Sequence, residues 1–214
     1  TFNEEALDGR WGFLEVAGRG GDPELVLDRF GRPFSITTPG ISIKPYPSGV
    51  LTHPSMDAVK FLMEENALKA SDVEKVTLYA ANNILHPIRF RIAKSELEGK
   101  FCMAFLLSAM IISGKAGKAE FTDEFVLSGP VQDMQKRVFT EFYADIDAMG
   151  HDRIRSRVEV NTKDGRHFVK WADENYRGSP HNPLSDKQVE GKFIDCAQGT
   201  IGCFRHGKYT IGVL

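Results

Sequence analysis

Apolar residues recur at three- and four-residue spacing from Met56 to Met63, which is the spacing of one face of an α-helix. Pro54 suits the first turn of such a helix, because a residue in the first turn needs no N–H donor. Residues 73 to 80 instead alternate between apolar and polar, and this pattern predicts a half-buried strand. We therefore expect a helix followed by a strand in the first half of the chain.

The longest apolar run, residues 101 to 112, predicts a helix that is apolar on nearly every side. Ser95 and Glu98 form a capping-box pattern before it, and Gly114 is a typical residue for its end. We expect one continuous helix over residues 96 to 113. It must be covered on most sides, and the sequence does not decide whether its own domain or a second subunit provides the cover.

Two breaks organise the following residues. The Gly129-Pro130 pair should divide residues 121 to 137 into two short helices, because proline cannot continue a helix interior without losing a hydrogen bond. The Asp164-Gly165 pair lies between two alternating segments, residues 155 to 160 and 167 to 171. This arrangement predicts a β-hairpin with a positive φ angle in its turn.

The two ends of the chain have weaker patterns. Ser185 and Gln188 form a second capping box, so a C-terminal helix should begin there. Near the N-terminus we expect short helices over residues 11 to 16 and 23 to 30, and extended chain over residues 34 to 43. Together these elements predict an α+β fold, with helices packed on a mainly antiparallel sheet and helical segments at both ends.

Composition excludes several classes of protein. The chain has 214 residues, of which 42% are hydrophobic and 26% charged, and its net charge is -2, as in an ordinary globular protein. No basic excess points to nucleic acid, and the longest apolar run is shorter than the roughly 20 residues that cross a bilayer. There is no secretory signal pattern, and without an initiator methionine we expect the chain to begin inside a longer protein.

The cysteines indicate a reducing, cytoplasmic location. Cys102, Cys196 and Cys203 are an odd number, at spacings that match no zinc framework and include no Cys-x-x-Cys pair for an iron–sulfur cluster. We expect all three to be ordinary core or surface thiols, and we expect no metal ligands.

Residues 43 to 54 are the densest candidate for chemistry. Prolines stiffen this loop, which leads into a helix N-terminus where free N–H groups favour an anion such as a substrate carboxylate. Lys44 adds a full positive charge, Ser48 lies in the same loop, and His53 is a candidate for proton transfer. The alternative interpretation is that Lys44 is a solvated lysine and His53 only a helix cap.

A second cationic stretch contains Arg89 and Arg91, close to His86. An anion-binding patch is one interpretation. Apolar residues alternate with the two arginines, however, so we favour a strand over residues 88 to 92 with one face in water.

Three blocks of the sequence resemble one known family. Lys44-Pro45-Tyr46-Pro47, followed by Thr52-His53-Pro54, closely resembles the opening of the lid domain in MmgE/PrpD proteins. Residues 101 to 115 are similar to the apolar lid helix of that family, and residues 180 to 185 with Lys192-Phe193 are similar to its G-x-P-x-N-P-L-S and K-F signature. The resemblance covers roughly residues 9 to 198, whereas the glycine-rich tail after residue 198 departs from it.

The resemblance implies a large all-helical domain with an α/β lid inserted in it. Residues 1 to 37 would end the first helical part, residues 38 to 176 would form the lid, and residues 177 to 214 would return to the helical domain. Family members act on small polycarboxylic acids as dehydratases, decarboxylases or epimerases without metal or organic cofactor, and a homodimer is expected.

By the same resemblance, Lys44 is the lid lysine that faces the pocket, and Ser48 and His53 are secondary substrate-binding candidates. The other catalytic residues would lie in an N-terminal helical domain of the same protein, which this chain does not contain, so the chain alone should be inactive. The rival interpretation is a non-catalytic module that binds a small anion or mediates dimerisation.

Overall fold

The computed structural model describes residues 5–7, 9–16, 24, 27–28, 30–150 and 154–197 of the chain. The chain divides into two compact units, Thr1–Ser42 and Ile43–Leu214. In the first unit, helix α1 spans Phe13–Val16, as predicted for this region, whereas half of the residues of the helix expected at residues 23 to 30 lie outside the described residues. Residues 34 to 40 form hydrogen-bonded turns, so the expectation of extended chain is wrong for them.

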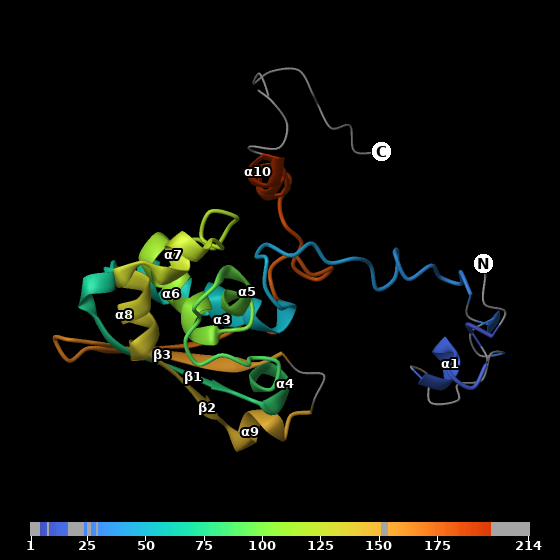
Figure 1. Ribbon diagram of the computed structural model, residues 1–214, viewed down its shortest axis with the longest axis horizontal. Helices are drawn as coiled ribbons and strands as arrows, with labels where there is room; N and C mark the ends of the chain where they lie inside the picture. The colour runs from blue at the N-terminus through green and yellow to red at the C-terminus, as the bar shows by residue number, and fades with distance from the viewer. Residues whose placement is uncertain are drawn as a thin grey trace. The chain divides into compact units, whose positions relative to one another are not determined.

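The second unit is built on a four-stranded sheet in the order β2-β1-β3-β4 (Figure 1). The strands are β1 (Val73–Ala80), β2 (Val138–Phe142), β3 (Ser156–Thr162) and β4 (His167–Trp171). β1 pairs with β2 in parallel and with β3 antiparallel, and β3 pairs with β4 antiparallel. The predicted α+β class with a mainly antiparallel sheet is confirmed.

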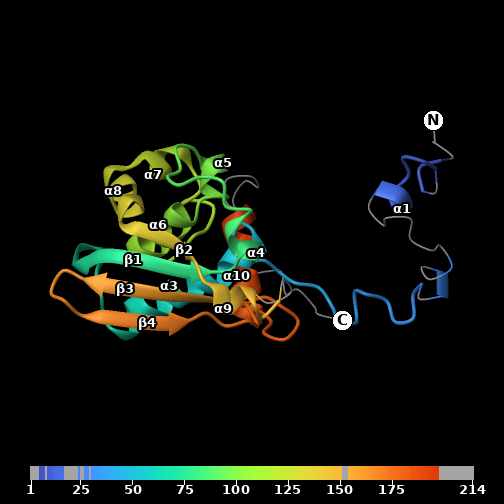
Figure 2. The same cartoon turned by 90° about the horizontal axis from the view of Figure 1, so that it is seen from below.

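Helices cover one face of this sheet, as Figures 1 and 2 show for α3, α6 and α8. The helices of the unit are α3 (His53–Glu65), α4 (Asn82–Leu85), α5 (Glu96–Gly99), α6 (Met103–Ser113), α7 (Asp123–Leu127), α8 (Gly129–Arg137), α9 (Ala144–Asp147) and α10 (Asp186–Ala197). The described part of the unit also contains two 3-10 turns, η1 (Val50–Thr52) and η2 (Ala70–Asp72). None of the helices in the described ranges has both the length and the apolar character that a membrane span requires.

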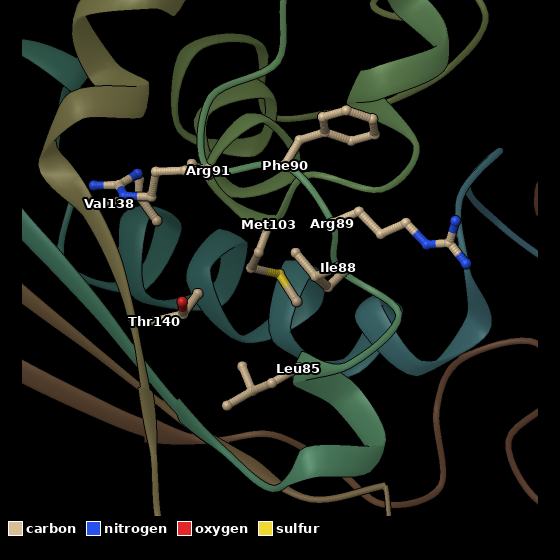
Figure 3. A pocket seen from close by; sticks show the side chains of 9 residues that line it. Leu85, Ile88, Arg89, Phe90, Arg91, Met103, Val138 and Thr140 are labelled. Atoms are coloured by element: carbon tan, nitrogen blue, oxygen red, sulfur yellow. The ribbon is translucent and has the colours of Figure 1, made fainter.

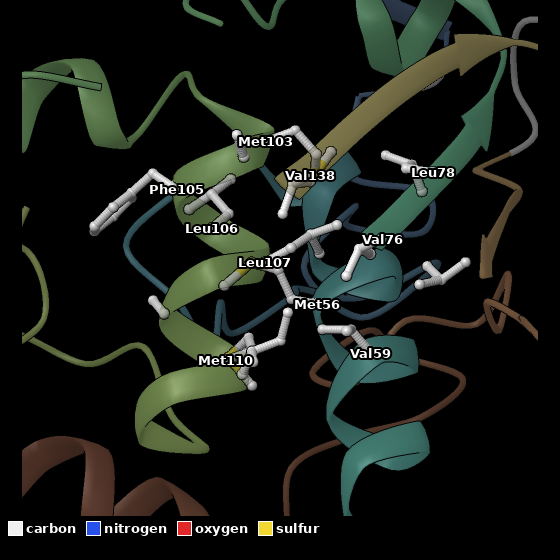
Figure 4. Packing of buried hydrophobic residues seen from close by; sticks show 14 of the residues in the cluster. Met56, Val59, Val76, Leu78, Met103, Phe105, Leu106, Leu107, Met110 and Val138 are labelled. Atoms are coloured by element: carbon white, nitrogen blue, oxygen red, sulfur yellow. The ribbon is translucent and has the colours of Figure 1, made fainter. Parts of the chain in front are cut away.

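The core forms where α6 packs beside α3 and α8 on the same face of the sheet, against strand β2. Every residue of α6 from Met103 to Ile111 is buried. Figure 4 shows Leu107 and Met110 pointing toward Met56 and Val59 of α3. α6 is therefore covered inside its own unit, which decides the question that the sequence left open.

The single helix expected over residues 96 to 113 is wrong in one respect, because α5 and α6 are separate. Gly99 leaves no room for a side chain, since an added Cβ would lie 2.8 Å from the ring of Phe105. The carbonyl of Phe101 turns out of the helix and accepts the N–H groups of Arg89 and Phe90. The expected ends are confirmed: Ser95 caps the amide of Glu98, and Gly114 ends α6 with a φ angle of 67°.

The strand expected over residues 88 to 92 is also wrong. The carbonyl of Phe101 takes the N–H groups of Arg89 and Phe90, and the side chain of Gln135 accepts the N–H of Ala93 at 2.8 Å. These bonds take up the N–H groups of Arg89, Phe90 and Ala93 without a strand partner. The parallel edge position beside β1 belongs instead to β2, which the sequence did not predict.

Three other predictions are confirmed. Helices α7 and α8 meet at Ser128, directly before the Gly129-Pro130 pair. β3 and β4 form the hairpin, whose Gly165 has a φ angle of 87°. Helix α10 begins directly after Ser185, whose hydroxyl accepts the amide of Gln188.

Candidate functional site

The loop from residue 43 to residue 53 is folded back on itself at the edge of the second unit. At its start, the N–H of Ile43 donates to the carbonyl of Gly178 at 2.8 Å. Lys44 is exposed, and its Nζ donates to the carbonyl of Ser48 at 3.4 Å. The loop therefore presents one ammonium group on its outer surface, held by a long and weak hydrogen bond.

The turn η1 changes the helix N-terminus that the sequence analysis expected to hold an anion. The N–H of Thr52 donates to the carbonyl of Gly49 at 2.9 Å, and the N–H of His53 donates to the carbonyl of Val50. Pro54 has no N–H to offer. These bonds occupy the amides of Thr52 and His53, so these two N–H groups are not free to bind an anion, and Lys44 is the cation that this loop presents.

Ser48 lies below the surface of the loop. Its side chain is buried, and its Oγ lies 3.1 Å from the Oγ1 of Thr52 and 3.7 Å from the sulfur of Met56. Only the main-chain carbonyl of Ser48 faces Lys44. The hydroxyl of Ser48 thus supports the loop from inside in this conformation.

His53 is fully buried, with 0% of its surface exposed, and packs edge-to-face on Tyr46 at a ring-centroid distance of 5.3 Å. Neither ring nitrogen has a hydrogen-bond partner among the residues that the structure describes. Burial lowers the pKa of His53 from 6.5 to about 4, and the nearby charge of Lys44 acts in the same direction. The imidazole is therefore neutral at pH 7.

Tyr46, Asp57 and Arg177 form a cluster that the sequence analysis missed. The hydroxyl of Tyr46 donates to Oδ1 of Asp57 at 2.5 Å. Arg177 donates to both carboxylate oxygens of Asp57, at 3.0 and 3.3 Å, and to the Tyr46 hydroxyl at 2.7 Å. Burial and the charge of Asp57 raise the pKa of Tyr46 well above its usual value, so the hydroxyl stays protonated.

The two arginines near residue 90 do not form one patch. They line a pocket of about 260 Å³ whose other walls are mainly apolar, but Figure 3 shows Arg89 and Arg91 extending to opposite sides of it. Arg91 donates to the carbonyl of Gln135 at 3.1 Å and lies 5.0 Å from the ring centroid of Phe139. Their charges do not converge on one ligand position, and within the described ranges no group of acidic, histidine or cysteine side chains could hold a metal ion.

Position 178, where the chain passes close to the loop of residues 43 to 53, requires a glycine. Its φ angle is 91°, and an added Cβ would lie 2.0 Å from the carbonyl oxygen of Ile43. We expect Gly178→Ala to lower the free energy of unfolding by about 2 kcal/mol, because it adds backbone strain to a steric clash. Urea denaturation would measure this, with Gly191→Ala as the control, since nothing lies within 4 Å of a Cβ added there. Equal stability of the two variants would contradict the close approach.

Comparison with known proteins places these features in a family context. Residues 46–206 match the model of the MmgE/PrpD C-terminal domain, which is more than half of the chain. Lys44 lies just before the first matched residue, whereas the other members of the candidate site lie inside the match. No curated protein matches the chain.

Proposed function

The chain belongs to the MmgE/PrpD family, and from that premise we propose that it is the lid-bearing C-terminal part of a cofactor-independent lyase or isomerase of small polycarboxylic acids. Substrates such as 2-methylcitrate or cis-aconitate fit this class, with dehydration, decarboxylation or epimerisation as the reaction. The supporting observation is the exposed Lys44 ammonium. The loop that carries it is hydrogen-bonded to Gly178, which lies inside the part of the chain that matches the family.

We assign Lys44 to substrate carboxylate binding. Removing a proton beside a carboxylate builds negative charge on the substrate, and a cation placed at that point lowers the barrier. The present hydrogen bond from Lys44 to the Ser48 carbonyl measures 3.4 Å, longer than a normal bond. Exchanging this weak partner for a carboxylate oxygen therefore costs little, and His53, being neutral, does not compete for the anion.

Ser48 and His53 stay predicted substrate contacts only for a conformation in which the loop opens. In the closed loop both side chains are buried, and the ring of Tyr46 packs against His53. Their proposed contribution in this state is support of the loop that carries Lys44.

The first unit supports a proposal about the partner of the chain. Apolar side chains around α1 are largely exposed, including Trp11 at 81% and Phe13 at 65%. Large exposed apolar patches usually mark an interaction surface. We propose that an N-terminal helical domain of the same protein covers them and carries the remaining acid–base residues, in a cytoplasmic homodimer.

The experiment is to assay this chain and the complete gene product that contains it on 2-methylcitrate and cis-aconitate. We expect turnover by the complete protein and none by residues 1 to 214 alone, because most walls of the site lie outside the chain. Turnover by the chain alone would refute a site divided between two domains. Inactivity of the complete protein on both acids, and on iminodisuccinate as a substrate for epimerisation, would favour the non-catalytic module.

A further inference from the structure

The chain enters and leaves the sheet-containing part of the second unit at one place. The segments at residues 43 to 46 and 176 to 182 lie side by side near α3, as Figure 1 shows. They are joined by the hydrogen bond from the Ile43 N–H to the Gly178 carbonyl. The Gly178 N–H in turn donates to the carbonyl of Asn182 at 2.7 Å, which closes the second segment into a turn.

Arg177 connects this crossing to both the loop and α3. Its planar guanidinium binds the carboxylate of Asp57, a residue of α3, through two nitrogens and also donates to the phenol of Tyr46. The guanidinium carbon lies 5.3 Å from the Tyr46 ring centroid. Because the phenol also donates to Asp57, each of the three side chains is bonded to the other two.

This arrangement fixes the backbone on both sides of Tyr46. Pro45 and Pro47 flank it, and the ring of proline restricts the φ angle of each. Only Pro45, whose φ angle is restricted, separates Tyr46 from Lys44. A fixed position of Tyr46 therefore also limits the position of the Lys44 backbone. The aromatic ring of Tyr46 also packs against His53 and so helps to keep that imidazole buried.

We propose that Arg177 is a positioning residue: through Tyr46 and Asp57 it holds the loop of residues 43 to 53 in the conformation that presents the Lys44 ammonium. The role of Lys44 in this inference rests on the proposed function. The effect of Arg177 on the conformation of the loop does not, and it can be measured in the chain itself. Lysine at position 177 would keep the charge but lose the planar fork that makes three bonds at once.

The test is amide hydrogen exchange, followed by NMR, in the 214-residue chain and its variants. The reporters are the amides of Ile43, Thr52 and His53, whose hydrogen bonds close the loop. We expect Arg177→Ala to speed their exchange by about tenfold or more, with a smaller effect for Arg177→Lys. Amides in β1 and β3 should keep their rates to within about twofold, because the sheet does not depend on this cluster.

Arg166→Ala is the matched control, since Arg166 also pairs with a carboxylate, that of Asp164, but in the exposed hairpin turn. It should leave the loop amides unchanged. Loop rates within about twofold of wild type in Arg177→Ala, or equal acceleration in the loop and the sheet, would overturn the positioning role. If Arg177→Ala does not fold, Tyr46→Phe decides by the same comparison, because it removes the hydroxyl that receives the Arg177 bond.

A second measurement separates this inference from the proposed function. In the complete protein, Arg177→Ala should lower kcat/KM by about tenfold or more, with partial recovery in Arg177→Lys, as expected when a binding group is displaced by a fraction of an ångström to an ångström. A complete wild-type protein without activity would defeat the proposed function, while the exchange rates would still decide the role of Arg177. If the complete protein is active and Arg177→Ala leaves its kcat/KM unchanged, the claim that Arg177 positions Lys44 is contradicted, whereas the proposed function is not.

Discussion

Replacing Lys44 with methionine is expected to lower kcat/KM of the complete protein by about 10²–10³-fold, the usual loss when one preorganised group that stabilises developing charge is removed. Methionine keeps an unbranched side chain of similar reach but has no charge. The backbone of the loop should stay in place, because the Tyr46, Asp57 and Arg177 contacts do not involve Lys44. Steady-state kinetics on the substrate that the wild-type protein turns over would measure the effect.

Lys163→Met is the control for this substitution, because Lys163 is an exposed lysine in the hairpin turn directly after β3. Its kcat/KM should equal that of wild type. If Lys44→Met retains kcat/KM within about threefold of wild type, Lys44 does not stabilise the transition state, because removal of one charge-stabilising group has a much larger effect.

The buried histidine should make the fold sensitive to mild acid. The pKa of His53 is about 4 in the folded chain against 6.5 for a free histidine, because burial disfavours the imidazolium form. Between pH 6.5 and 4 the unfolded chain therefore binds a proton that the folded chain does not, and stability falls as the pH is lowered. The loss approaches about 3 kcal/mol below pH 4, where both states are protonated.

Urea denaturation at pH 7 and at pH 4.5 measures this loss. Carboxylates also titrate in acid, so the informative quantity is the difference between wild type and His53→Phe, which fills the site with a ring that cannot be protonated. We expect the variant to lose clearly less stability than wild type between these two pH values. His86→Gln, at an exposed histidine, should behave as wild type, and a His53→Phe profile parallel to that of wild type would contradict the buried neutral imidazole.

Elements with a strong local pattern could be predicted from the sequence. The spacing of Met56 and Met63 with Pro54 predicted α3, strict alternation predicted β1, and Asp164-Gly165 predicted the hairpin turn. In each case the residues that determine the element lie within one or two turns of it, so periodicity and turn chemistry are sufficient.

Elements decided by distant contacts could not be predicted. Residues 88 to 92 alternate like a strand, but the Phe101 carbonyl and the Gln135 side chain take their amides. β2 has one buried residue, Val138, and becomes a strand because β1 is available in parallel. Such pairing depends on the long crossover connection that a parallel pair requires.

The candidate site shows the same division. The proline-flanked loop and its Lys44 could be selected from the sequence as a candidate site, and the family was recognised from the same residues. Arg177 was not, because its partners Tyr46 and Asp57 are 131 and 120 residues away along the chain. The 3-10 turn directly before α3 was also missed, since Gly49 to Thr52 carry no pattern that separates a 3-10 turn from an ordinary loop.

The most direct test is a crystal structure of the complete protein with a non-reacting tricarboxylate such as tricarballylate. We predict that Nζ of Lys44 leaves the Ser48 carbonyl and lies about 2.7–3.2 Å from a ligand carboxylate oxygen, facing the helical domain. A ligand bound elsewhere, with the Lys44 ammonium still on Ser48 and directed away from any concave surface, would contradict it.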